Sequence, residues 1–218
     1  MNLPQFHNQQ LLITALTHRS ALNENISAAT QSNERLEFLG DAVLELITTD
    51  FLYLNHPQQP EGVLTAYRSA LVKTTTLALI AKRLGLGEKL YMSKGEEATG
   101  GRDNQGLLAD SFEAFIGALY LDQGLDPVKK FLEENLFIEF DRIKADKLYR
   151  DAKSLLQETV QAKGFETPTY EVLKSAGPDH DKIFTVQVII DGQAAGVGEG
   201  KSKQEAQQQA AQVALEKF

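Results

Sequence analysis

The sequence predicts two domains of different fold class: an all-α domain over residues 1–146 and a small α+β domain over residues 151–218, joined by a linker at 147–150. Two observations support this division. Apolar residues recur at helical spacing through most of the first part. In the second part, two helical segments enclose three short runs with strand character. A length of 218 residues is enough for one or two such domains.

Five segments of the first part have apolar residues three or four positions apart, which predicts helices. They are residues 11–22, 34–55, 64–86, 107–124 and 128–144. Glycines are expected at helix ends and prolines at helix starts or connections, namely Gly85, Gly87, Gly124, Pro57, Pro60 and Pro127. The polar, glycine-rich stretch MSKGEEATGGRDNQG (92–106) is expected to be a loop.

The second part has the element order α-β-β-β-α. Residues 151–164 and 201–218 have helical periodicity, and the second of these helices is rich in alanine. Three strands with turn residues between them are expected at 169–175, 182–191 and 193–200. The 68 residues from 151 to 218 are enough for a small independent domain.

Composition and charge restrict the possible functions. The chain has no cysteine, which excludes disulfides and thiolate metal sites. The sequence opens without a basic, then apolar, leader, and no apolar run is long enough to cross a membrane. We therefore expect a cytoplasmic protein. The net charge of −8 opposes binding to a polyanion such as nucleic acid.

Four acids lie on one side of the predicted helix 34–55, with no lysine between them: Glu34, Glu37, Asp41 and Glu45. Like charges three or four residues apart destabilise a helix. The opposite side is apolar and is expected to face the core; it carries Leu39, Val43, Leu46 and Ile47. This helix alone allows two interpretations, a solvated polar face or a site that binds a cation.

A second acidic pair lies on the predicted helix 107–124. Asp110 and Glu113 share a face with Ala114 and Gly117, small residues that let another helix approach closely. Carboxylates at a helix contact are costly unless a cation compensates them. Neither pair includes a histidine, and oxygen ligands alone suit Mg²⁺ or Mn²⁺. Two acidic pairs on facing helices therefore predict a divalent metal site, which would support phosphoryl-transfer chemistry.

Three blocks of the first part and one of the second resemble a known family. NERLEFLGDAVL (33–44) closely resembles the signature of the ribonuclease III family, and LTHRSAL (16–22) and LADSFEAFIGALYLD (108–122) resemble its flanking blocks. The C-terminal α-β-β-β-α segment with GEGKSKQEAQQQAA (198–211) is similar to a double-stranded-RNA-binding domain. The resemblance implies an all-helical endonuclease domain that acts as a homodimer, in which each subunit cuts one strand of an RNA duplex and leaves short 3′ overhangs.

The resemblance also implies roles for individual residues. The four positions that match the family's metal-site carboxylates are Glu37, Asp41, Asp110 and Glu113. Glu113 matches the acid whose loss abolishes cleavage, and Asp41 matches a residue that helps water attack the phosphodiester. Glu34 and Glu61 match acids at the edge of the cleavage site, whereas Glu45 has no catalytic counterpart and is expected to be surface or structural.

Several residues have a structural alternative. Phe38 lies beside the acids, so it belongs either to the core edge or, by the resemblance, to the dimer interface as an aromatic side chain that enters a socket on the partner.

His18 is expected to be structural, and Gly40 to allow close helix packing. Arg102 and Asn104 lie in the loop just before the second acidic helix. Either this loop is only a connection, or these residues contact RNA phosphate or hold the carboxylates in position. No P-loop is present, so no nucleotide cofactor is expected.

The second domain has groups suited to the shape of an RNA duplex, which offers 2′-hydroxyls in a shallow minor groove and phosphates beside it. The candidate RNA-binding residues are Gln157 and Glu158 on the first helix, His180 in the loop that also holds Pro178 and Asp179, and Lys201 and Lys203 at the start of the last helix. Phosphate is favoured at a helix N-terminus. The domain carries 7 lysines against 10 acids, so we expect weak, salt-sensitive binding by this domain alone.

Three functional interpretations remain at this point. The first is an endonuclease of double-stranded RNA that depends on Mg²⁺, for which Mn²⁺ can substitute. For this activity the resemblance implies precursors of ribosomal, messenger and transfer RNA as substrates. The second is a catalytically silent protein of the same fold that binds structured RNA. The third is a helical metalloprotein unrelated to RNA, which leaves the second domain unexplained.

Overall fold

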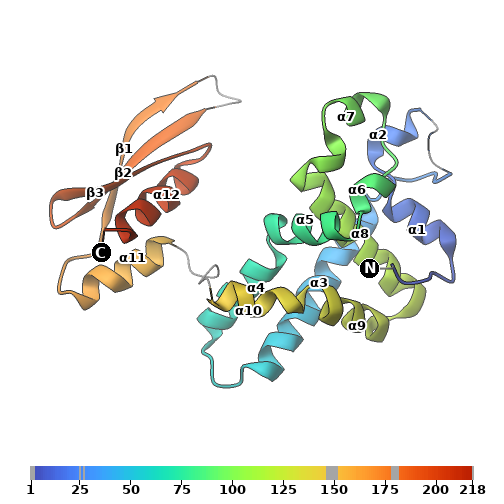
Figure 1. The fold of residues 1–218 in the computed structure, drawn as a ribbon, viewed down its shortest axis with the longest axis horizontal. Helices are drawn as coiled ribbons and strands as arrows, with labels where there is room; N and C mark the ends of the chain where they lie inside the picture. Colours follow the sequence, from blue (N-terminus) through green and yellow to red (C-terminus); the bar gives the residue numbers. More distant parts are fainter. Residues whose placement is uncertain (1–2, 25, 27, 146–151, 178–181, 218) are drawn as a thin grey trace. The chain divides into compact units, whose positions relative to one another are not determined.

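The computed structural model describes residues 3–24, 26, 28–145, 152–177 and 182–217 (Figure 1). The chain divides into two compact units, Met1–Tyr149 and Arg150–Phe218. The linker expected at 147–150 lies outside the described residues. No helix in the described part of the chain is both long and apolar enough to cross a membrane.

The first unit is helical, as predicted, with two short 3-10 segments. In chain order its elements are α1 (Gln9–Ala15), α2 (Arg19–Leu22), α3 (Glu34–Asn55), α4 (Glu61–Val72), α5 (Thr74–Arg83), α6 (Leu86–Lys89), α7 (Lys94–Ala98), η1 (Gly101–Asp103), α8 (Gln105–Gln123), α9 (Leu125–Asn135), η2 (Phe137–Glu139) and α10 (Phe140–Ala145).

Helix α8 forms the centre of this unit. Most of its apolar residues are buried, because α1, α3, α5 and α9 all pack against it. The largest of these buried side chains are Phe112, Phe115, Ile116 and Leu119. A helix that is buried on most of its circumference is held firmly, so groups on its remaining face have fixed positions.

Two glycines allow α3 and α8 to cross at backbone contact. A Cβ atom at Gly40 would overlap the carbonyl oxygen of Glu113, and one at Gly117 would overlap the carbonyl oxygen of Leu36. The expected packing role of Gly40 therefore agrees with the structure. The crossing brings the acidic side of α3 next to the acidic pair of α8.

Three predicted helices are interrupted. The segment 64–86 breaks at Lys73, which has extended backbone (φ −64°, ψ 148°), and the hydroxyl of Thr76 donates to the carbonyl of Ala70 across the break. The segment 128–144 breaks after Asn135 because Phe137 turns inward to stack on Phe51, with ring centroids 4.0 Å apart. Periodicity continues across such breaks, so the pattern alone could not locate them.

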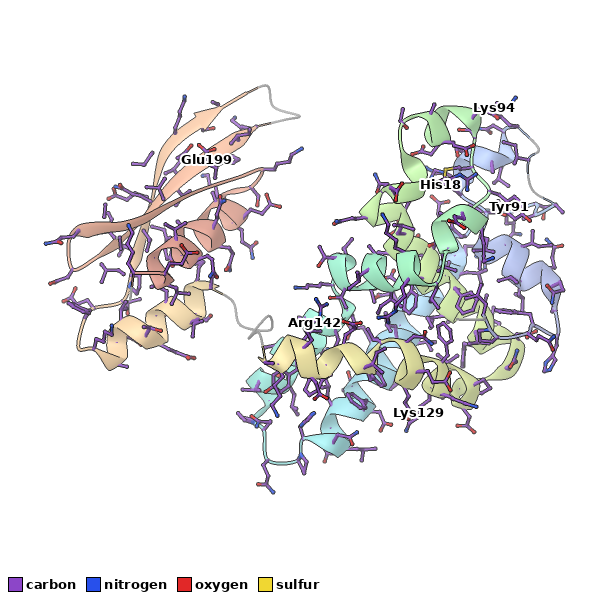
Figure 2. All side chains as sticks on the ribbon, viewed as in Figure 1. His18, Tyr91, Lys94, Lys129, Arg142 and Glu199 are labelled. Carbon is purple, nitrogen blue, oxygen red and sulfur yellow. The ribbon has the colours of Figure 1, made fainter. Side chains whose placement is uncertain are left out.

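The segment 11–22 breaks between α1 and α2 because its backbone pairs with a distant segment. The amide of Tyr91 donates to the carbonyl of Leu16 at 2.8 Å, and the amide of His18 donates to the carbonyl of Tyr91 at 2.9 Å. His18 and Tyr91 are labelled in Figure 2. This contact places the start of α2 beside the segment that follows α6.

Two further expectations about the first unit were wrong. The stretch 92–106 is not only loop, since it contains α7 and η1; the hydroxyl of Ser93 caps α7 by accepting from the amide of Glu96. Leu46 is 58% exposed rather than part of the core. The buried stripe of α3 is centred on its contact with α8 and runs through Leu36, Gly40, Val43, Leu44 and Ile47.

The second unit has the predicted order: α11 (Ala152–Ala162), β1 (Thr169–Ala176), β2 (Ile183–Ile190), β3 (Gln193–Gly200) and α12 (Lys203–Leu215). The strands form an antiparallel sheet in the order β1-β2-β3. The two helices and one face of the sheet enclose a small core that includes Leu156, Val160 and Val188. Glycines of β3 let α12 approach the sheet, because a Cβ at Gly196 or Gly198 would overlap the α12 backbone.

Candidate functional site

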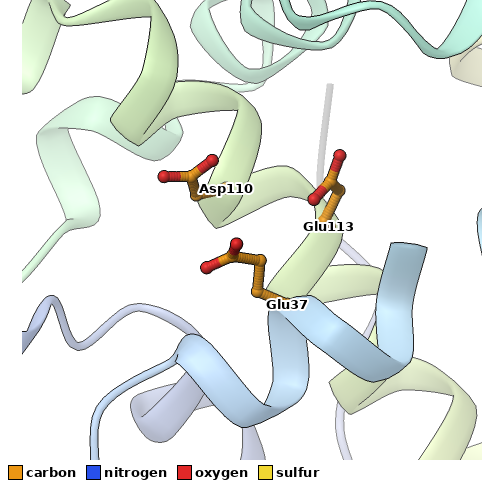
Figure 3. A group of neighbouring side chains, drawn as sticks. All are labelled: Glu37, Asp110 and Glu113. Atoms are coloured by element: carbon orange, nitrogen blue, oxygen red, sulfur yellow. The ribbon is translucent and has the colours of Figure 1, made fainter. Parts of the chain in front are cut away.

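Three of the four carboxylates predicted to bind a metal converge between α3 and α8. Single carboxylate oxygens of Glu37, Asp110 and Glu113 all lie within 4.8 Å of one another. Figure 3 shows Glu37 reaching from α3 toward the two acids of α8. All three side chains are half-buried. We call these three residues the acidic group.

Local structure fixes the two acids of α8. Asn104 is the N-cap of this helix, and its side-chain oxygen accepts a hydrogen bond from the amide of Leu107 at 3.2 Å. Asp110 and Glu113 lie one turn apart on the face that contacts α3. The glycine crossing described above then sets their distance from Glu37. Asn104 therefore caps the helix that carries both acids.

Among the described residues, no ion pair compensates the charge of the acidic group. None of the ion pairs within the described ranges involves Glu37, Asp110 or Glu113. Burial and the carboxylates of Asp41, Asp110 and Glu37 raise the pKa of Glu113 to about 8. Burial is also the main cause that raises the pKa of Glu37 and that of Asp110. A bound divalent cation would reverse these shifts.

The donor chemistry of the acidic group fits a hard divalent cation. Its ligand atoms are all carboxylate oxygens, which Mg²⁺ and Mn²⁺ prefer. Asp41, the fourth predicted ligand, lies outside this group and is exposed. It is nevertheless close enough for its charge to raise the pKa of Glu37 and of Glu113.

The two acids predicted at the edge of the site lie in different places. Glu34 accepts a hydrogen bond from the Ser32 hydroxyl at 2.7 Å and lines a cavity of about 410 Å³ together with Glu37 and Asp110. Glu61 lies instead in a separate groove of about 400 Å³ between α3 and α4, where it accepts from the Thr65 hydroxyl at 2.9 Å. Within one chain, Glu61 is therefore not part of the acidic group.

Glu45, the remaining acid of the α3 stripe, forms an ion pair with Arg68 of α4 at 2.9 Å. It is not part of the acidic group. This arrangement is consistent with the structural role expected for Glu45.

Phe38 projects from α3 away from the core and is 82% exposed. The core-edge alternative is therefore wrong. The side chain borders a hollow of about 710 Å³, whose apolar lining includes Leu11, Leu39 and Leu121. An exposed phenylalanine beside an apolar hollow is typical of an interaction surface.

Arg102 has a structural role in the first unit. Its Nη1 donates to the carbonyls of Gly87, Glu88 and Leu90 at 2.8, 3.2 and 3.1 Å, and its Nε donates to Glu97 at 2.7 Å. These bonds connect η1 to α6, to Leu90 just after it, and to α7. The guanidinium is therefore occupied by protein acceptors, which argues against the phosphate contact that the sequence left open.

His18 is also held by protein contacts. It is the N-cap of α2, and its Nδ1 lies 2.8 Å from the Ser20 hydroxyl. This bears out the structural role expected for it. His18 also lines the cavity of about 410 Å³ beside the acidic group, together with Arg19 and Asn33. Arg19 and Asn33 were not predicted as site residues; their position next to the signature acids was the signal that could have identified them.

The candidate RNA-binding residues of the second unit are exposed where they are described. Gln157 and Glu158 lie on the outer side of α11, and Lys201 and Lys203 lie at the start of α12. His180 lies outside the described residues.

The N-terminus of α12 is closed by a capping box. Ser202 accepts from the amide of Glu205 at 3.1 Å, while the Glu205 carboxylate accepts from the amides of Lys201 and Ser202 at 2.8 and 3.2 Å. Backbone amides that were expected to bind phosphate are thus partly used by Glu205.

Comparison with known proteins agrees with both units. Residues 8–140 match the family model described as Ribonuclease-III-like, and residues 152–218 match the double-stranded RNA binding motif. The chain is 50% identical to Ribonuclease 3 of Geobacillus kaustophilus over 211 residues, covering 97% of this chain and 85% of that protein. It is 49% identical to Ribonuclease 3 of Bacillus velezensis over 213 residues, covering 98% and 85%.

A solved nuclease domain of ribonuclease III from Campylobacter jejuni has a similar fold, with a TM-score of 0.57 and 39% identity over 63% of this chain and 92% of that chain. Its match agrees with the helical first unit, and the binding-motif match agrees with the α-β-β-β-α second unit. The chain therefore belongs to the ribonuclease III family of endoribonucleases.

Proposed function

We propose that this protein is a Mg²⁺-dependent endonuclease that hydrolyses phosphodiester bonds in double-stranded RNA and leaves short 3′ overhangs, with Mn²⁺ able to replace Mg²⁺. The observation that carries the proposal is the acidic group, three half-buried carboxylates within 4.8 Å and without an ion-pair partner in the described chain. The double-stranded RNA binding motif at residues 152–218 supports the choice of substrate.

Glu37, Asp110 and Glu113 would hold the metal ion, with Asp41 completing the set from its exposed position on α3. Bound Mg²⁺ would supply Lewis-acid stabilisation of the phosphodiester and a water of lowered pKa. The protein's own contribution is positional: the glycine crossing and the Asn104 cap hold the carboxylates in place. Asp41 would orient the attacking water, and Glu34 and Glu61 would contact the RNA at the edge of the site.

The second unit would hold the duplex by its shape. Gln157 and Glu158 would contact 2′-hydroxyls in the minor groove, and Lys201 and Lys203 would contact the phosphates beside it. His180 is proposed for a second minor groove. Because residues 151–218 carry a net charge of −3 (7 lysines against 10 acids), the affinity of this unit should be low and strongly dependent on salt. A dimer would offset this through effective concentration.

We also propose a homodimer in which Phe38 enters the apolar hollow of a second copy. The Campylobacter jejuni nuclease domain has a structurally flexible region that is involved in dimer formation of that protein. A dimer would also offer a route by which Glu61 reaches a cleavage site, since Glu61 lies apart from the acidic group of its own chain. Ribosomal RNA precursors, messenger RNA and transfer RNA precursors are the proposed substrates, and the cytoplasm is the proposed location.

Phe38→Glu is expected to convert the dimer to a monomer, because a charge in an apolar hollow has a high desolvation cost. Light scattering should show half the wild-type mass, with an unchanged circular dichroism spectrum. Ile138→Glu is the matched control, since Ile138 is also an exposed apolar residue (51%) but does not line the hollow. An unchanged mass for the Phe38 variant would contradict the dimer assignment.

The function is tested by incubating the full chain with a long duplex RNA in Mg²⁺, in Mn²⁺ or in EDTA, and by separating the products on a gel. Short fragments are expected with either metal ion and uncut RNA with EDTA. Duplex binding without cleavage in either metal would instead identify a catalytically silent RNA-binding protein.

A further inference from the structure

The cavity of about 410 Å³ beside the acidic group has a wall of hydrogen-bond donors that the metal site does not use. Glu34, Glu37 and Asp110 line one part of it, and His18, Arg19 and Asn33 line another. The donor-bearing residues come from the start of α2 and the residue before α3. A ligand that uses both walls must carry acceptor atoms beside a group that binds a metal ion.

Asn33 is the most informative of these residues. It is only 5% exposed and occupies the N-cap position of α3, yet its side chain makes no capping hydrogen bond. Its backbone is satisfied, since its amide donates to the Thr17 carbonyl at 2.9 Å and its carbonyl accepts from the amides of Leu36 and Glu37. Within the described part of the chain, its carboxamide has no hydrogen-bond partner. The side chain lines the cavity and is not among the fully enclosed side-chain atoms that lack a partner, so its carboxamide is open to the cavity and available to a ligand.

The hydrogen bonds around His18 fix which ring nitrogen is the donor. The backbone amide of Ser20 donates to His18 Nδ1 at 3.4 Å, and the Ser20 hydroxyl lies 2.8 Å from the same nitrogen. The Ser20 oxygen also accepts from the amide of Ser93 at 3.0 Å; the bond from the Ser20 amide, in which Nδ1 is the acceptor, is what leaves Nδ1 without a proton. In the neutral ring the proton is therefore on Nε2, which makes His18 a hydrogen-bond donor to the cavity.

Arg19 adds a mobile positive charge at the rim. Its side chain is 74% exposed, and its Nη1 lies 3.7 Å from the carboxylate of Glu34. A long, exposed ion pair of this kind contributes little to stability, so the guanidinium can exchange this partner for another anion at small cost. Arginine binds phosphate through two parallel hydrogen bonds, which suits this exchange.

We propose that this cavity binds a backbone phosphate of the RNA strand adjacent to the bond that is cut, through Asn33, His18 and Arg19. The proposal rests on the endonuclease function proposed above. The acids of one wall hold the metal ion, while the donors of the other wall hold the neighbouring phosphate. This division explains why a donor-rich wall lies directly beside carboxylates. It also fixes the register of the strand, because one phosphate at the donors places the next one at the acidic group.

The first test uses two asparagines of equal burial. Asn33 and Asn135 are both 5% exposed, but the Asn135 carboxamide donates to the Phe131 carbonyl at 2.9 Å. Asn33→Leu should reduce cleavage of duplex RNA in Mg²⁺ by roughly 10- to 100-fold, the value of a hydrogen bond to a charged group. Its melting temperature should stay close to that of the wild type, because the carboxamide that is replaced does not cap α3. Asn135→Leu should instead lower the melting temperature and leave cleavage by the folded protein unchanged.

The second test removes the charge at the rim. Arg19→Gln should raise KM for duplex RNA by roughly 10-fold, the loss of one charged hydrogen bond, with a smaller change in kcat. Lys130→Gln, an equal loss of charge on an exposed residue of α9, should change KM much less. The increase in melting temperature on adding Mg²⁺ should be retained in the Asn33 and Arg19 variants, because the acidic group is intact.

Four results would overturn the proposal: normal cleavage by Asn33→Leu, a loss of stability in Asn33→Leu equal to that in Asn135→Leu, equal changes in KM for the two charge variants, or loss of the Mg²⁺ effect. The last result would assign Asn33 to the metal site instead. Failure of the endonuclease proposal is separate and would be seen as uncut RNA with the wild-type protein in Mg²⁺.

Discussion

Replacing Glu113 with glutamine is expected to reduce cleavage of duplex RNA by roughly 10²- to 10⁴-fold, the range found when one group that stabilises or activates the reacting atoms is removed. Glutamine keeps the shape of the side chain but removes the negative charge from the acidic group, which then binds a divalent cation less tightly. Duplex binding should remain, because the second unit is unchanged. A cleavage assay with labelled duplex and a binding assay at the same Mg²⁺ concentration measure the two effects.

The same substitution is expected to stabilise the metal-free protein. The pKa of Glu113 is about 8 in the folded protein and about 4.3 in an unfolded chain. The folded state therefore binds more protons between these values, so stability falls as pH rises through this window and the loss is complete above pH 8. Glutamine does not titrate. In EDTA, the melting temperature of Glu113→Gln should exceed that of the wild type by an amount that grows from pH 5 to pH 8.

Added Mg²⁺ should reverse the order of the two melting temperatures, so that the wild type melts at the higher temperature. A ligand that binds only the folded protein raises its melting temperature, so the wild type should gain from Mg²⁺ and the variant should gain much less. Glu134→Gln is the control for net charge, because Glu134 is an exposed acid of α9 outside the acidic group. If Glu113→Gln cleaved RNA normally in Mg²⁺, the metal assignment would be wrong.

The sequence predicted the features that depend on local spacing. The two units, the element order of the second unit and the long helices α3 and α8 follow from periodicity, and the acidic group follows from acids at helical spacing on two segments. The face of α8 was informative because Ala114 and Gly117 accompany Asp110 and Glu113, and small residues beside acids indicate a close helix contact. The structure confirms that contact at Gly40 and Gly117.

The features that the sequence missed depend on contacts between distant segments. Arg102 donates to carbonyls 12 to 15 residues earlier in the chain, which no motif indicates. The break at Lys73 was missed because apolar periodicity continues across it. Asn33 was overlooked for a different reason: asparagine before a helix is usually read as a cap, and only the structure shows that its side chain does not cap α3.

Gly40→Ala is expected to destabilise the first unit by about 1–3 kcal/mol, or more if the helices cannot separate. Alanine is normally the better helix former by about 0.5–1 kcal/mol, so the expected effect has the opposite sign to the intrinsic preference. The reason is that the new Cβ would overlap the carbonyl oxygen of Glu113 and lie 2.9 Å from the amide nitrogen of Gly117. Both neighbours are backbone atoms of α8, and a rotamer change cannot move them.

Separation of α3 and α8 would also widen the acidic group, because Glu37 lies one turn before Gly40 and Glu113 lies at the contact itself. Cleavage by Gly40→Ala should therefore need a higher Mg²⁺ concentration, in addition to the lower melting temperature. Gly62→Ala is the matched control: Gly62 lies in α4, and a Cβ there would meet no atom within 4 Å, so it should be neutral or stabilising. If Gly40→Ala instead matched Gly62→Ala in stability and kept the wild-type Mg²⁺ requirement, the backbone contact between the two helices would not be what positions the carboxylates.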